Sequence, residues 1–122
     1  MKRDMELIRK MVLAIEDEPS GFAPHFNFDA FTSEHIGSHA HLMNQAGLAT
    51  GSNVTHTGSI GPEAVLTALT WTGHEFAAAA RNESIWKQAM KSLKDKGMTV
   101  TISVLVQLLS KLAAGALGTG SK

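Results

Sequence analysis

Apolar residues recur every three or four positions along several segments of the chain, which is the spacing of one face of a helix. The first segment spans residues 4–17, and Asp4 is a suitable N-cap for it. A second helix is expected to be capped by Thr32 or Ser33 and to reach about Ala46, because Gly47 readily adopts the left-handed conformation that follows helix C-termini. The N-terminal part of the chain therefore predicts two helices joined by a loop.

Two strands are expected after the second helix. Residues 48–54 and 64–71 have the composition of strands and flank a loop rich in Gly, Ser and Thr. Residues 26–28 alternate as a very short strand would. Three apolar side chains of the second strand are expected on one side of it: Val65, Leu69 and Trp71.

A capping box follows directly after this strand. Thr72, with Glu75 three residues later, predicts the start of a third helix. At this junction we expect Trp71 to be buried with its indole N–H bonded, since aromatic side chains mostly serve cores, and His74 to close the turn. A ligand pocket around these two residues is the less favoured alternative.

The C-terminal third predicts two further helices. Asn82 is a suitable cap for residues 83–96, and residues 101–114 carry a wide apolar stripe. On the first of these helices the spacing directs three residues inward: Trp86, Met90 and Leu93. It directs three lysines outward: Lys87, Lys91 and Lys94.

The order of these elements is that of a winged helix. Residues 19–31 leave room for a loop and a short strand but for no further helix, so the helix-turn-helix is abbreviated. The sequence predicts an α+β, winged-helix-like domain with an abbreviated helix-turn-helix, a two-stranded wing and a C-terminal helical extension. We expect residues 1–80 to form the core, residues 81–117 to form oligomerising helices of the same domain, and residues 118–122 to fray.

Several motifs of the chain resemble a family of bacterial and phage hypothetical proteins that share a domain of unknown function. The resemblance covers nearly the whole chain, in these motifs: Met1-Lys2-Arg3-Asp4-Met5-x-Leu7-Ile8-Arg9-Lys10, His39-x-x-Leu42-Met43-x-x-Ala46-Gly47-Leu48, Leu69-Thr70-Trp71-x-Gly73-His74-x-Phe76, Arg81, Trp86, and Lys87-x3-Lys91-x2-Leu93-Lys94-x-Lys96-Gly97. This resemblance implies a winged-helix-like fold and implies no activity.

Composition narrows the functional classes. The 122 residues carry 11 basic and 11 acidic side chains and no cysteine, which excludes disulfides and fits the cytoplasm. We expect no secretory signal, because the charged N-terminus lacks an apolar core, and no membrane span, because the most apolar run is short and interrupted by polar residues. Nucleophile-elbow and phosphate-loop motifs are missing from the sequence, so an enzyme is not expected.

Charge also argues against duplex recognition by the second helix. Asn44 and Gln45 can read adenine edges, but residues 22–80 contain no Lys or Arg to neutralise phosphates. Basic residues of the first helix are the nearest substitutes: Lys2, Arg3, Arg9 and Lys10. DNA binding is therefore the runner-up, and a protein-facing or structural helix is favoured.

Two histidines are weak candidates for a metal site. His35 and His39 share a helical face, but two imidazoles do not make a site and no third ligand is indicated. The favoured interpretation is that His39 packs or hydrogen-bonds at a seam between helix and sheet, while His35 lies in solvent. No cofactor is predicted.

Two surfaces of the C-terminal helices remain as candidates for partners. The lysine ridge at Lys87, Lys91 and Lys94 is most simply a solvated face, with an acidic protein or phosphates as the alternative. The last helix has a wider apolar stripe than a small domain usually covers, so we expect self-association through these residues: Ile102, Leu105, Val106, Leu109 and Leu112. The alternative is that this stripe completes the chain's own core.

These observations favour a small non-enzymatic regulatory or interaction module, a homo-oligomer that binds another protein through its neutral winged face or its lysine ridge. A DNA-binding regulator is the first alternative. A protein that sequesters a small ligand at the seam of a dimer is the second.

Overall fold

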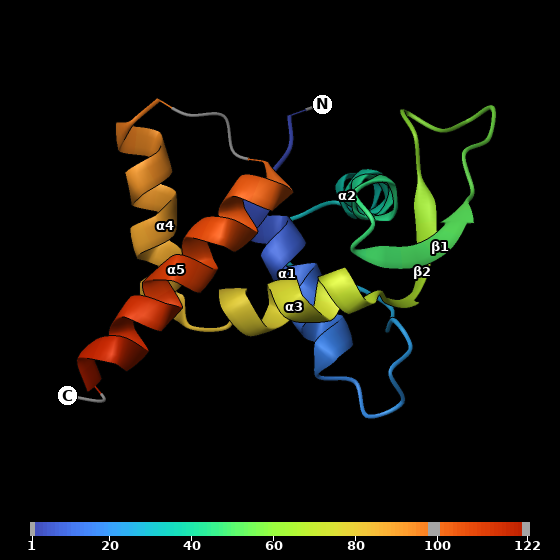
Figure 1. Ribbon diagram of the computed structural model, residues 1–122. Coiled ribbons are helices and arrows are strands. Elements are labelled where there is room, and N and C mark those ends of the chain that lie inside the picture. Colours follow the sequence, from blue (N-terminus) through green and yellow to red (C-terminus); the bar gives the residue numbers. More distant parts are fainter. Residues whose placement is uncertain (1, 98–100, 121–122) are drawn as a thin grey trace. The chain divides into compact units, whose positions relative to one another are not determined.

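The computed structural model describes residues 2–97 and 101–120, with side chains as far as residue 115. It contains five helices and two strands, in this order: α1 (Met5–Glu16), α2 (Ser33–Gln45), β1 (Ala49–Asn53), β2 (Ala64–Leu69), α3 (Trp71–Ala80), α4 (Glu83–Asp95) and α5 (Ile102–Gly120). The fold class is α+β, as predicted (Figure 1). The chain divides into two compact units, unit 1 (Met1–Ala77) and unit 2 (Ala78–Lys122).

Local capping explains where the first two helices of unit 1 begin. The Asp4 carboxylate accepts the N–H of Glu6 at 3.0 Å and that of Leu7 at 3.2 Å. The Thr32 hydroxyl accepts the N–H of His35 at 3.1 Å. Both caps are as predicted, and α2 is followed by Gly47 with a φ of +76°. Together α1 and α2 contribute much of the core: Leu7, Ile8, Met11, Val12, Ile15, Ala40 and Met43 are buried.

The sheet consists of β1 and β2 in an antiparallel pair whose register shifts at one point. Thr50 pairs with Ala68 and Gly51 with Leu66, so Thr67 is an extra residue in β2. Such a bulge changes which residues face the core. The predicted grouping of Val65, Leu69 and Trp71 on one side is therefore wrong: Leu66 and Leu69 are buried and Val65 is 60% exposed.

The short strand predicted at residues 26–28 is absent from the described chain. Instead Phe22 forms an isolated bridge with Ala68, and the N–H of Ala23 donates to the carbonyl of Thr67 at 2.7 Å. Pro24 follows, and because it has no N–H it cannot extend this pairing. The chain thus pairs with β2 two residues before the proline and then leaves it.

The junction between β2 and α3 also differs from the prediction. Thr70 caps α3, since its hydroxyl accepts the N–H of Gly73 at 3.1 Å and donates to the carbonyl of Gly47. Trp71 is the first residue of α3 and is 80% exposed, so its predicted burial is wrong. His74 instead ties α3 to α1, because its Nδ1 lies 2.6 Å from a carboxylate oxygen of Glu16 at the end of α1.

Unit 2 contains α4 and α5, which pack against each other. The Asn82 side chain accepts the N–H of Ile85 at 3.0 Å, so α4 is capped as predicted. Trp86 and Leu93 of α4 are buried, and Met90 is half-buried. The helix α5 extends to Gly120, past the expected end near residue 114; of the tail expected to fray, residues 121 and 122 lie outside the described residues. Within the described chain, every helix is too short or too polar to cross a membrane.

Candidate functional site

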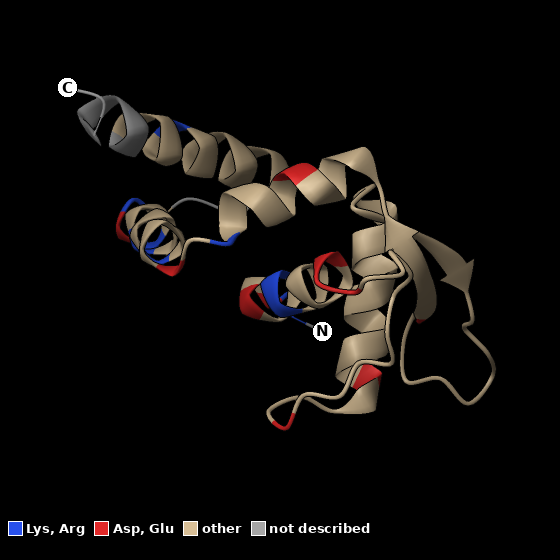
Figure 2. Ribbon diagram, turned by 90° about the horizontal axis from the view of Figure 1, so that it is seen from below, with Lys and Arg blue, Asp and Glu red and all other residues tan. Residues whose placement is uncertain are grey.

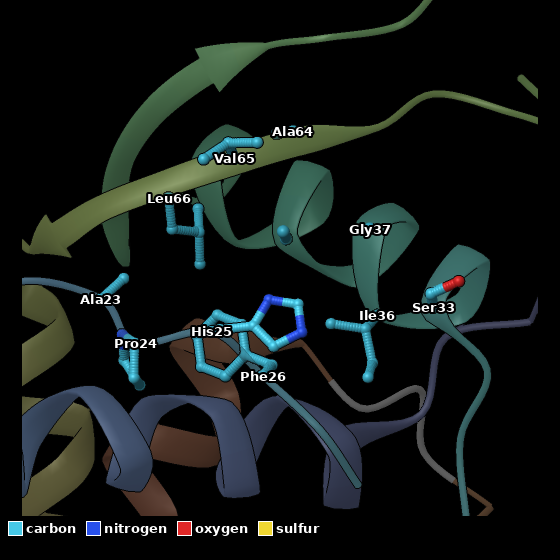
Figure 3. A pocket seen from close by; sticks show the side chains of 11 residues that line it. Ala23, Pro24, His25, Phe26, Ser33, Ile36, Gly37, Ala64, Val65 and Leu66 are labelled. Carbon is cyan, nitrogen blue, oxygen red and sulfur yellow. The ribbon is translucent and has the colours of Figure 1, made fainter.

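A cavity of about 350 Å³ opens in unit 1 between β2, α2 and the segment of residues 23–26 (Figure 3). It exists because this segment pairs with β2 only at its start and then diverges. Figure 3 shows Leu66 and Ile36 pointing into the space from β2 and α2. Most of the lining is apolar, with two polar side chains that are exposed: His25 and Ser33. We call this space the β2 groove.

The wall of the β2 groove includes a strand edge. The N–H of Val54 donates to the carbonyl of Glu63 at 3.0 Å, so that carbonyl faces the β1 side. Backbone groups alternate in direction along an antiparallel strand, so those of Ala64 and Leu66 face the outer edge. Among the described residues, this outer edge forms one backbone hydrogen bond to another segment, in which the carbonyl of Thr67 accepts the N–H of Ala23. The outer edge over residues 64–66 borders the cavity, and Ala64 and Leu66 are each 7% exposed. A further strand would reach this edge through the cavity.

Exposed apolar side chains flank this edge. Phe22 is 63% exposed where it bridges to Ala68, and Val65 is 60% exposed on β2. Large exposed apolar side chains that lie beside an apolar hollow are typical of interaction surfaces. At the tip of the hairpin, Ile60 is 86% exposed as well. The apolar surface of unit 1 thus continues from the cavity to its rim.

The two units carry opposite charge. Unit 1 has four Lys or Arg and nine Asp or Glu, a net charge of −5, whereas unit 2 has seven and two, a net charge of +5. Figure 2 shows no Lys or Arg on α2 or the hairpin. Residues 22–80 contain four acidic residues instead: Asp29, Glu34, Glu63 and Glu75. Any ligand of the β2 groove therefore meets an acidic surrounding.

The two histidines considered for a metal are used differently. His39 is fully buried; its Nδ1 donates to the carbonyl of His35 at 2.9 Å and its Nε2 accepts the N–H of Asp4 at 2.8 Å. Burial lowers the pKa of His39 and keeps the ring neutral. His35, expected in solvent, is half-buried, and its ring centroid lies 4.6 Å from that of His39.

Neither ring nitrogen of His39 is left for a metal, and the contact joins α1 with α2 rather than a helix with the sheet. Among the described residues, no three His, Cys, Asp or Glu side chains are grouped as metal ligands. The weak metal hypothesis for His35 and His39 gains no support from this geometry.

The residues considered for reading DNA come from α1, α2 and the segment before α1. Asn44 donates from its amide to the carbonyl of Ala49 at 3.3 Å, which turns it toward β1, while Gln45 is exposed. Lys2, Arg3 and Lys10 are exposed. Arg9 is half-buried and pairs with Glu6 at 3.4 Å. The helix α2 itself carries no Lys or Arg, and Lys2 lines a hollow together with Glu34, His35 and Ser38 of this helix.

The candidates in unit 2 fall into an exposed and a buried group. Lys87, Lys91 and Lys94 are exposed on α4, and Lys87 lies 3.4 Å from Glu83. On α5, Leu105 and Leu109 are fully buried within the single chain, so they are not available to a partner in this conformation. The other residues expected in an oligomer interface are half-buried: Ile102, Val106 and Leu112.

Sequence reasoning did not find the β2 groove. Pro24 after Phe22 and Ala23 is the one local signal for it, because a proline ends strand pairing. The bulge at Thr67 that aligns Thr67 with Ala23 has no comparable signal.

Comparison with known proteins places the chain among relatives without an assigned chemistry. A family described as hypothetical protein (DUF2513) matches residues 2–99. An uncharacterized protein of Haemophilus influenzae is 30% identical over 110 residues, which cover 88% of this chain and 92% of that relative. No solved structure matches the chain.

Proposed function

The chain belongs to the DUF2513 family of hypothetical proteins, and from that premise we propose that it is a non-enzymatic interaction module that binds an extended segment of a partner protein in the β2 groove. The observation that carries the proposal is the outer edge of β2 over residues 64–66, directly beside an apolar cavity. A lack of cysteine fits a cytoplasmic setting.

Strand addition is the binding mode that this geometry suits. An extended peptide gains affinity from backbone hydrogen bonds to an exposed strand edge and specificity from pockets for alternate side chains. Ala64 and Leu66 supply the edge, and the chain's own Ala23 already uses the neighbouring position at Thr67. A partner strand would continue the pairing that Pro24 ends.

The cavity and the charge define the partner's chemistry. A space of about 350 Å³ suits one or two apolar side chains of such a strand. The net charge of −5 on unit 1 favours a segment that carries Lys or Arg beside its apolar residues. We therefore propose an extended, cationic segment with apolar side chains at alternate positions.

The same observations rank the alternatives. In a winged-helix-like arrangement, α2 is the helix that would read DNA, but it lies in a stretch without Lys or Arg and its Asn44 is bonded to Ala49. Phosphate contacts dominate nucleic-acid affinity, so this face is better suited to a protein. A small apolar ligand fits the cavity volume but would not use the strand edge.

A peptide-display library tests the proposal. Selection against the native protein is expected to enrich extended sequences with alternating apolar residues and added Lys or Arg. Ser33→Trp places a bulky ring at the exposed rim of the groove and should weaken these peptides at least about tenfold. Ser84→Trp, at an exposed position in the first turn of α4 that does not line the groove, is the matched control and should leave binding unchanged.

Amide hydrogen exchange locates the bound peptide. The N–H of Leu66 should gain protection on binding, because it would donate to the added strand. Peptides that bind Ser33→Trp as tightly as the native protein, or that leave the Leu66 amide unprotected, would refute the proposal. An apolar molecule that binds without protecting this amide would favour ligand sequestration instead.

A further inference from the structure

The opposite charges of the two units point to an interaction that does not depend on the β2 groove. We propose that the exposed lysine face of α4, formed by Lys87, Lys91 and Lys94, binds the acidic surface of unit 1 in a second copy of the chain. The proposed partner is thus the same protein, and each copy carries both the lysine face and the acidic surface.

The lysine face has the geometry of a docking surface. Residues 87, 91 and 94 follow one another at intervals of four and three, which places them on one side of a helix, with successive side chains about one turn apart. All three lysines are exposed. Lys87 pairs with Glu83, and both of these side chains are at least 70% exposed. An ion pair this exposed contributes little and is easily exchanged for another.

Unit 1 supplies the complementary surface. Asp29 and Glu34 are exposed on the loop before α2 and on its first turn, and Glu63 is half-buried beside β2. Residues 22–80 contain no Lys or Arg that would compete for these carboxylates. Lys2, from the segment before α1, lines the same hollow as Glu34 and Glu63, so a cationic helix of another copy would meet these carboxylates beside one like charge.

A second copy fits these charges better than a nucleic acid. The whole chain has a formal net charge of zero, so it exerts no net long-range attraction on a polyanion, because the charge of −5 on unit 1 offsets the charge of +5 on unit 2. A second copy, in contrast, offers the lysine face a unit 1 of net charge −5.

The apolar face of α5 does not compete with this assignment. Its central residues, Leu105 and Leu109, are fully buried in the single chain. Self-association through exposed charge therefore requires no rearrangement of the core of unit 2, whereas association through these leucines would.

Sedimentation of the full chain tests the interaction. At about 50 mM salt the average mass should rise with concentration from the 13.0 kDa of one chain toward a dimer, and at about 500 mM salt the association constant should fall at least about tenfold. Substitution of all three lysines by glutamate (Lys87→Glu, Lys91→Glu, Lys94→Glu) should abolish association. Substitution of all three by arginine keeps the charge and should retain it.

A charge swap identifies the partner surface. The variant Asp29→Lys with Glu34→Lys should not associate with itself, but it should form a mixed dimer with the triple-glutamate variant. Circular dichroism confirms that both variants, altered only at exposed positions, are folded. A native chain that stays monomeric at low salt, a triple-glutamate variant that still associates, or swapped variants that fail to pair would each overturn the proposal. Duplex DNA binding to the lysine face by a monomeric chain would replace it.

Discussion

The backbone N–H of Asp4 donates a hydrogen bond to Nε2 of His39 at 2.8 Å, across 35 positions of the sequence. The other ring nitrogen donates to the carbonyl of His35, so the ring is held as one neutral tautomer between the start of α1 and the middle of α2. A protonated ring would present an N–H toward the N–H of Asp4 and lose this bond.

This contact predicts acid sensitivity. Burial, and to a lesser degree the neighbouring His35, lower the pKa of folded His39 below the value of 6.5. Below pH 6.5 the unfolded chain therefore binds more protons than the folded one, and the free energy of unfolding should fall as the pH drops toward the folded pKa, by at most about 1.4 kcal/mol per pH unit. Above pH 6.5 this contribution is fully present. Urea unfolding measures this pH dependence between about pH 5 and 8, the range in which histidine titrates.

The control for this prediction is a pair of variants. His39→Gln removes the titration and should flatten the pH dependence, at a cost of about 1–3 kcal/mol if its amide does not replace both hydrogen bonds. His25→Gln replaces an exposed ring, and the free energy of unfolding of this variant should depend on pH as that of the native protein does. An unchanged slope in His39→Gln would show that other groups cause it.

Capping of α3 provides a second prediction. Thr70→Ala removes the hydroxyl that accepts the Gly73 N–H and bonds the Gly47 carbonyl, and it should lower the free energy of unfolding by about 1–2 kcal/mol. Thr72→Ala, the residue that the sequence favoured as the cap, should change it by no more than about 0.5 kcal/mol. Chemical unfolding of both variants compares the two threonines, and equal losses would contradict the observed cap.

Gly73 is predicted to tolerate no side chain. It is buried in the first turn of α3, and a Cβ there would collide with the backbone carbonyl of Leu48. Gly73→Ala should therefore destabilise by about 2 kcal/mol or more, although alanine is the better helix former. Gly61→Ala meets no atom within 4 Å and should be nearly neutral. Thermal unfolding separates the two, and a stable Gly73→Ala protein would show that the α3 junction differs.

The two tryptophans should report different environments. Trp71 is 80% exposed and Trp86 is 3% exposed. In variants in which Phe replaces one of the two tryptophans, iodide should quench the fluorescence of Trp71 strongly and that of Trp86 weakly. Trp71→Ser should leave the free energy of unfolding within about 0.5 kcal/mol, whereas Trp86→Ala should cost about 3–5 kcal/mol. Weak quenching of Trp71 would restore the burial expected from the sequence.

Features that depend on neighbouring residues were predictable, and those that depend on distant ones were not. Asp4, Thr32 and Asn82 cap helices as their positions predict, because a cap needs only the next three residues. The exposure of Val65 depends instead on the extra residue Thr67, and a bulge is defined by the partner strand.

The candidate site was less predictable than the fold for the same reason. The β2 groove forms where Ala23 meets Thr67, two segments separated by the whole of α2 and β1. Its charge, in contrast, was visible at once, since the lack of Lys and Arg over residues 22–80 is a property of the sequence alone.

That lack also decides which chemical probes can reach the site. No Lys or Arg lies between Lys10 and Arg81, so trypsin releases α2, β1, β2 and α3 within one large peptide. Amine-directed cross-linkers find no lysine among the residues that line the β2 groove; in unit 1 they react at Lys2, before α1, and at Lys10, on α1. Reagents that couple a partner's own lysines to carboxylates remain available there, with Glu63, next to Ala64 of the groove lining, as an acceptor.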